Sequence, residues 1–255
     1  MDLFFIEKDA IAFLGLMSFA NKHFDAQFTH PDGAQSHANG LNIFAAITDN
    51  IDGQVIGQQQ NAIHSTCNPM MHAEQLALKE AIGTLGQKRP RDPATTSVEN
   101  YYRKKLFTEP GTTGNYNVGG TIYTTLEPCP FCTAALLVNR MKRIVYIIPD
   151  KVYGDTFPVL KQKYASYDMV YQQLQLDTTM PGTIIAFAAY QLGVLQNYVA
   201  AHPDTIGTLY LDDLKPFLQE CSNTFLQFTD ADLATTGNQK ERNAKTLNDL
   251  QNNAG

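Results

Sequence analysis

One short stretch decides the fold: residues 125–132 read TLEPCPFC, with Cys129 and Cys132 spaced three apart. Residues with this spacing lie on the same side of a helical turn and can hold one ion together. Pro128 and Pro130 suit the start of a helix, where free backbone N–H groups and the positive end of the helix dipole favour anionic thiolates. Taken alone, this cysteine pair is a moderate signal of a metal site.

A third potential ligand, His72, stands within His-Ala-Glu at the start of another predicted helix. With Cys129 and Cys132 it makes three zinc ligands, which leave a tetrahedral zinc ion one open position for water. A structural site would normally be closed by a fourth ligand, but we interpret the nearest candidate, Cys67, as an ordinary buried or loop thiol. Glu74 is not needed as a ligand, so its carboxylate is free to exchange protons with a metal-bound water.

Around these clusters the chain alternates strands and helices, which is typical of layered α/β domains. The predicted elements are an opening helix within residues 7–28, hairpin strands at 41–48 and 54–63, a helix at 72–82, a strand at 121–126, a helix at 132–141 and a strand at 143–148. Asp52 and Gly53 supply the hairpin turn. Residues 83–120 are interrupted by prolines and glycines, so we expect an insertion there, with a short helix at 98–107.

The pattern turns helical after residue 155. Apolar and aromatic residues recur at steps of 4, 3, 4 and 3, which lines up one packed helix face: Leu160, Tyr164, Tyr167, Tyr171 and Leu174. Further helices are predicted at 183–201 and up to about residue 228. The sequence therefore predicts an α/β domain at 1–155 that carries the zinc ligands, a helical extension at 156–228, and a polar, poorly ordered tail at 229–255.

Composition and charge limit the classes of partner. No run approaches ~18 consecutive uncharged apolar residues, so we expect no membrane-spanning helix, and we expect a cytoplasmic protein. The formal net charge of −6 weakens the case for a dedicated nucleic-acid binder, because phosphate contacts leave a basic footprint. One segment is locally basic, through Lys88, Arg89, Arg91, Arg103, Lys104 and Lys105. We favour a solvated loop there over a phosphate contact.

The combined pattern, His-x-Glu followed by Pro-Cys-x-x-Cys, resembles the zinc deaminase signature of the cytidine deaminase superfamily. The run TLEPCPFC is most similar to the guanine deaminase and tRNA adenosine deaminase branch, and the order of elements over roughly residues 38–155 follows that family. This resemblance implies a three-layer α/β/α fold with a central mixed sheet. It also implies a bound Zn²⁺ and a homodimer.

The resemblance implies further site residues as well. Asn61 matches the asparagine with which such enzymes contact the base, although a strand-end Asn can instead bond its own turn. Ala73 and Phe157 are the other expected substrate contacts, with Phe157 covering a pocket wall at residues 150–154 or serving packing alone. Glu127 is expected to be a structural carboxylate that organises the cysteine turn.

The leading hypothesis is a hydrolytic deaminase of a nucleobase, nucleoside or nucleotide, with a guanine-like purine favoured. Zinc-bound hydroxide would attack the carbon that carries the amine, and Glu74 would move a proton from the water to the ring nitrogen and the departing ammonia. An alternative is a deaminase of tRNA or another polynucleotide, which the basic segment keeps open. A second alternative is a non-catalytic, zinc-stabilised binding protein, against which the presence of Glu74 argues.

Overall fold

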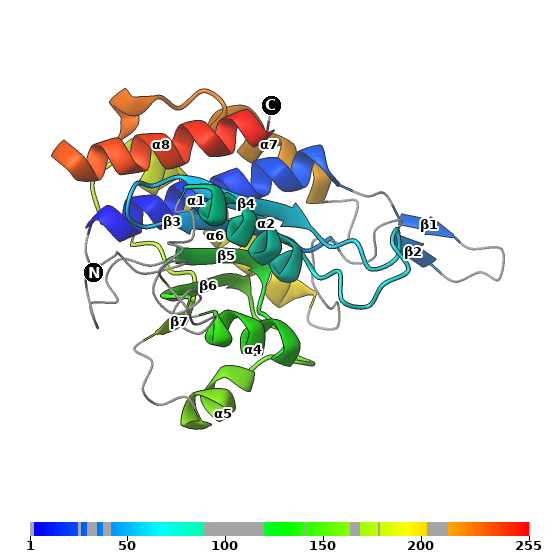
Figure 1. The fold of residues 1–255 in the computed structure, drawn as a ribbon. Helices are drawn as coiled ribbons and strands as arrows, with labels where there is room; N and C mark the ends of the chain where they lie inside the picture. The colour runs from blue at the N-terminus through cyan, green and yellow to red at the C-terminus, as the bar shows by residue number, and fades with distance from the viewer. Residues whose placement is uncertain are drawn as a thin grey trace, which may run out of the picture.

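A five-stranded mixed sheet forms the centre of the protein (Figure 1). The strands, in spatial order, are β4 (Val55–Gln60), β3 (Phe44–Asp49), β5 (Gly120–Leu126), β6 (Arg143–Ile148) and β7 (Val170–Gln173). β3 is antiparallel to β4 and β5, whereas β5, β6 and β7 run parallel. This computed structural model describes residues 3–24, 27–29, 35–37, 42–88, 120–139, 141–163, 169–177, 179–202 and 214–254.

Helices cover both faces of the sheet, so every residue of β3 and β5 is buried. One face carries α1 (Leu3–Lys22), on which α6 (Thr183–Ala201), α7 (Lys215–Phe225) and α8 (Gly237–Ala254) pack. The other face carries α2 (Ala73–Lys88), α4 (Pro130–Val138) and α5 (Thr156–Lys163). The remaining elements are the paired strands β1 (Gln27–Thr29) and β2 (Gln35–His37) and the short helix η3 (Asp230–Asp232). The predicted three-layer fold is confirmed.

The elements predicted around the two ligand clusters are confirmed as well. The hairpin turns at Gly53, whose φ of 77° favours glycine and whose N–H donates to the carbonyl of Asp49. The predicted insertion, however, begins later than residue 83, because α2 continues to Lys88 through two glycines. A helix tolerates such glycines at about 1 kcal/mol each, so composition alone misplaced this boundary. The predicted short helix at 98–107 lies outside the described residues.

The prediction of a poorly ordered tail at 229–255 is wrong. Helix α8 lies along α1 (Figure 1) and places the fully buried Leu247 and Leu250 against it. Gly15 of α1 leaves the space that Leu250 fills. The buried carboxylate of Glu7 accepts a hydrogen bond of 2.8 Å from Asn243 of α8. The polar average composition of this segment led to the wrong prediction, because its few apolar residues form one narrow stripe along the helix.

The helix predicted from the spacing of Leu160 to Leu174 is also wrong. Helix α5 ends at Lys163, and Tyr171 lies in β7, which pairs with β6. Steps of three and four residues line up one face of a helix, but hydrogen bonding to a neighbouring strand overrides such a local pattern. Tyr171, which its spacing placed on a helix, therefore belongs to the sheet.

The edge strand β4 is held from two sides. Its Val55 N–H donates to Asp249 of α8 at 2.9 Å, and its Gln58 N–H donates to Glu80 of α2, also at 2.9 Å. Edge strands left unpaired invite association with other chains, and these carboxylates occupy two of the donors. The strand leads directly to Asn61, so both helices help to place that residue.

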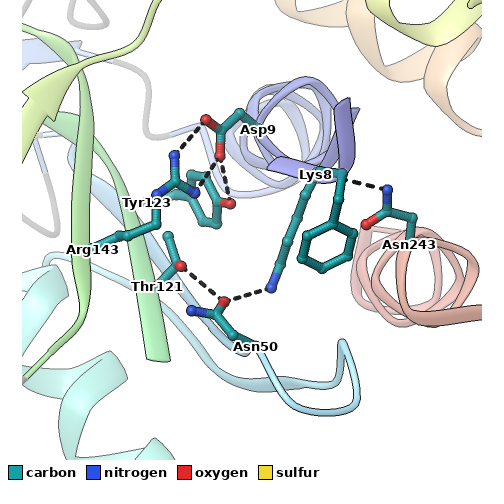
Figure 2. A network of polar contacts seen from close by, with 8 residues as sticks. Lys8, Asp9, Asn50, Thr121, Tyr123, Arg143 and Asn243 are labelled. Atoms are coloured by element: carbon teal, nitrogen blue, oxygen red, sulfur yellow. Dashed lines mark hydrogen bonds and ion pairs between the residues drawn. The ribbon is translucent and has the colours of Figure 1, made fainter. Parts of the chain in front are cut away.

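A buried polar network ties α1 to the end of the sheet that lies opposite Asn61, where β6 begins (Figure 2). Asp9 accepts two hydrogen bonds of 2.8 and 2.7 Å from Arg143 and one of 2.8 Å from the Tyr123 hydroxyl. Lys8 donates to Asn50 at 2.7 Å, and burial, followed by repulsion from Arg143, lowers the pKa of Lys8 to about 7. These contacts fix α1 beside the first residue of β6.

Among the described helices, α6 is long and apolar enough to cross a membrane by length and composition alone. Seven of its residues are buried in the protein, and it contacts α1. Core helices of globular proteins have this same composition. The absence of a membrane-spanning helix therefore stays a prediction.

Candidate metal centre and active site

Two helices begin at the same end of the strands of the sheet and bring the three predicted ligands together. His72 directly precedes α2, and its carbonyl accepts the N–H of Leu76 at 3.0 Å. Cys129 is the N-cap of α4, with Pro130 as the first helical residue, and Cys132 lies in the first turn. The nitrogen and sulfur atoms of the three ligands lie within 4.8 Å of one another, as predicted.

The electrostatics of this cluster suit a zinc ion. The pKa of Cys129 is lowered to about 4, first by a hydrogen bond from the Cys132 thiol and then by one from His72, whose Nδ1 lies 3.8 Å from the sulfur. The pKa of His72 is raised, chiefly by the same contact with Cys129. Two cysteine sulfurs and one imidazole nitrogen at helix N-termini form a donor set that zinc prefers. The residues present therefore fit Zn²⁺.

Cys67 does not complete the set. It is exposed, has a φ of 50°, and its thiol contacts the carbonyl of His64. Among the described residues, the clustered ligand atoms belong to His72, Cys129 and Cys132. A zinc ion held by three protein ligands keeps one position for water, which is the arrangement of catalytic zinc sites.

Glu74 lies in the first turn of α2 with its carboxyl group almost completely buried. Its Oε2 has no hydrogen-bond partner within the described part of the chain. Burial raises the pKa of Glu74 to about 7. A carboxyl group that binds and releases a proton near neutral pH suits general acid–base catalysis.

Asn61 also has an unsatisfied side chain. Only 2% of the residue is exposed, and its backbone N–H donates to the carbonyl of Ile43 at 2.9 Å. Neither Oδ1 nor Nδ2 has a partner among the described residues, which rules out the alternative that this side chain bonds its own turn. A buried amide without partners is costly, and at a site it indicates a group awaiting a ligand.

The other two expected substrate residues are placed less decisively. Ala73 is the first residue of α2 and is fully buried. Phe157 is 7% exposed and stacks on Tyr171, with ring centroids 4.4 Å apart. Phe157 therefore has a packing role in the structure, and substrate contact by either residue stays a prediction.

Glu127 organises a different segment from the one expected. Its carboxylate accepts hydrogen bonds from the backbone of the loop after β6 and from Tyr171. The cysteine turn is instead held by Thr133, whose hydroxyl donates to the carbonyl of Pro128 at 3.0 Å and whose N–H donates to that of Cys129 at 2.9 Å. Sequence reasoning missed Thr133 and Tyr171, because neither side chain belongs to a recognisable motif.

Residues 21–148 match the family described as the cytidine and deoxycytidylate deaminase zinc-binding region. The chain belongs to this deaminase family. The tRNA-specific adenosine deaminases of Aquifex aeolicus and Rickettsia felis are both 28% identical to it, over 108 and 116 residues. These matches cover 42% and 46% of this chain and 54% and 62% of the relatives. The chain thus spans between half and two thirds of the length of these relatives.

Solved structures similar to this deaminase family member include the guanine deaminase from Bacillus subtilis. It is 20% identical, with 62% of this chain and 78% of that chain covered and a TM-score of 0.30. A structure from a study of tRNA:A34 deaminases is 23% identical, with 52% and 77% covered and a TM-score of 0.36. Strand β7 and all described elements after it follow the zinc-binding region that matches the family.

Proposed function

We propose that the protein is a zinc-dependent hydrolytic deaminase that releases ammonia from a nucleobase, nucleoside or nucleotide. The observation that carries this proposal is the buried Glu74, whose Oε2 lacks a partner in the described residues, close to three zinc ligands. A purely structural zinc site has no physical need for such a carboxyl group. This argues against a non-catalytic binding protein.

Each residue of the site has a distinct task in this reaction. His72, Cys129 and Cys132 would hold the zinc, which supplies a water of lowered pKa when bound. Glu74 takes one proton from the attacking water and delivers it to the ring nitrogen. It then takes the remaining proton of the same oxygen and delivers it to the amine, which leaves as ammonia while the carbonyl group forms. Asn61 offers one acceptor and two donor hydrogens, which can orient the edge of a base.

For the substrate, a guanine-like purine or small nucleoside is favoured because the net charge of −6 disfavours a polyanion. A tRNA or other polynucleotide substrate is the second candidate, supported by the names of the relatives and by the basic residues between 88 and 105. Residues 89–105 lie outside the described part of the chain. The homodimer is a further expectation, which sedimentation equilibrium would check.

The test is ammonia release by zinc-loaded protein from a panel of free bases, nucleosides, nucleotides, single-stranded DNA and tRNA. We expect turnover of at least one small purine substrate, and we expect Glu74→Gln to abolish it. Turnover confined to tRNA would favour the second candidate. If no compound in the panel releases ammonia, the proposed function is wrong.

A further inference from the structure

The carboxylate of Glu127 is the meeting point of three separate segments. Its Oε2 accepts the N–H of Asp150 at 3.1 Å, and its Oε1 accepts the N–H of Asp155 at 3.1 Å and the hydroxyl of Tyr171 at 2.8 Å. Glu127 is 4% exposed and stands two residues before the ligand Cys129. The loop after β6 and strand β7 are therefore both tied to the segment that carries a zinc ligand.

The loop at residues 150–155 is built tightly around this carboxylate. Gly154 has no room for a side chain, since a Cβ there would lie 2.2 Å from the Asp150 carbonyl oxygen and 2.4 Å from Glu127 Oε2. The Asp150 carboxylate accepts the N–H groups of Val152 and Tyr153 at 2.8 and 3.0 Å. The side chains of Val152 and Tyr153 are more than half exposed. The loop thus presents two apolar groups to solvent from a backbone whose position depends on Glu127.

Tyr171 supplies the one side-chain donor of the three, and its ring is held in place. It stacks on Phe157 at 4.4 Å with an interplanar angle of 2°, and it packs on Tyr146 at 5.3 Å. Burial, together with the hydrogen bond to Glu127, raises the pKa of Tyr171 well above its usual value, so the hydroxyl stays a donor. The ring packing aims this hydroxyl at one oxygen of Glu127.

We infer that Tyr171 is a positioning residue for the deamination reaction and that it acts on substrate binding. Its hydroxyl fixes the rotamer of Glu127, and Glu127 in turn fixes the loop at 150–155 beside the strand end that leads to Cys129. Tyr171 follows the zinc-binding region that matches the family, so this restraint is supplied by the C-terminal part of the chain. The inference rests on the proposed function, because it assigns the loop to the substrate side of that site.

The test compares Tyr171→Phe, which removes the hydroxyl and keeps the ring packing, with Tyr146→Phe as the matched control. Tyr146 lies on the adjacent strand and packs on Tyr171, but its hydroxyl is not one of the three donors to Glu127 described above. Measurements are zinc content, melting temperature, and the KM and kcat of ammonia release on the best substrate of the panel. We expect Tyr171→Phe to raise KM about tenfold, equivalent to about 1.4 kcal/mol. The kcat and zinc content should stay within twofold, and the control should match the wild type.

Three results would overturn the inference while the proposed function stands. They are a KM for Tyr171→Phe within twofold of wild type, a loss confined to kcat or zinc content, and an equal KM rise in Tyr146→Phe. A lowered melting temperature with unchanged KM falls under the first result and would make the hydroxyl merely structural. If the zinc-loaded wild type turns over nothing in the panel, the proposed function fails and this inference fails with it.

Discussion

The contact between Leu250 of α8 and Gly15 of α1 gives a quantitative test of the fold. Leu250 is fully buried, and a Cβ added at Gly15 would lie 2.7 Å from its Cδ1, 3.0 Å from its Cβ and 3.1 Å from its Cγ. Leu250→Ala removes three carbon atoms, at about 0.8 kcal/mol each for lost burial, and leaves a cavity. We therefore expect a loss of about 3 kcal/mol in the free energy of unfolding.

A substitution on the other side of the same contact sharpens the test. Gly15→Ala alone overpacks the contact, at about 1–3 kcal/mol, against a gain of about 1 kcal/mol in helix propensity. In the Leu250→Ala background the two most distal obstructing atoms, Cγ and Cδ1, are gone, so the new methyl group partly fills the cavity. The double variant should therefore be at least about 1 kcal/mol more stable than the sum of the single effects predicts.

Urea unfolding followed by circular dichroism, with zinc in excess, measures all three variants. Asn248→Ala is the matched control, because Asn248 is an exposed residue of the same helix. It should change the free energy of unfolding by less than about 0.5 kcal/mol. A Leu250→Ala variant as stable as this control, or a strictly additive double variant, would refute the packing of α8 on α1.

Three further predictions concern charge, metal and nucleic acid. Because the pKa of Lys8 is about 7 in the folded protein against 10.5 unfolded, unfolding takes up a proton in that range, so stability rises with pH. Lys8→Met should remove this pH dependence, which is up to about 1.4 kcal/mol in the free energy of unfolding per pH unit between pH 7 and 9.5. An equal rise of the free energy of urea unfolding with pH in the wild type and the variant would contradict this. His72→Ala should lower both zinc content and melting temperature, and full zinc occupancy by elemental analysis would exclude His72 as a ligand. Alanine at Arg103, Lys104 and Lys105 should leave tRNA binding weak and unchanged in a titration at two salt concentrations. Submicromolar binding lost in that variant would favour a polynucleotide substrate.

The metal centre could be predicted from the sequence because its chemistry restricts both residue type and spacing. Only a few types of side chain bind zinc. In addition, His72, Cys129 and Cys132 each stand where a helix begins, and strong local sequence signals indicate such helix starts. The same reasoning separated Glu74 from the ligands. Asn61 needed the resemblance to be noticed, and the structure added that neither polar atom of its side-chain amide has a partner among the described residues.

The errors arose where tertiary contacts override local pattern. Helix α8 is polar on average, and its stability comes from a narrow stripe that includes Leu247 and Leu250, packed on α1. Tyr171 continued a helical spacing, yet β6 recruits its segment as a parallel strand. Parallel pairing depends on a distant partner, so no local window of sequence contains the information.

The central claim is that Glu74 moves protons beside a zinc ion that it does not bind. The most direct measurement pairs the ammonia-release rate with zinc content for the wild type, Glu74→Gln and His72→Ala. Glu74→Gln should keep about one zinc per chain and the wild-type melting temperature while losing at least ~10²- to 10⁴-fold in turnover. Near-normal turnover in Glu74→Gln would contradict the mechanism, and zinc loss equal to that of His72→Ala would place Glu74 among the ligands.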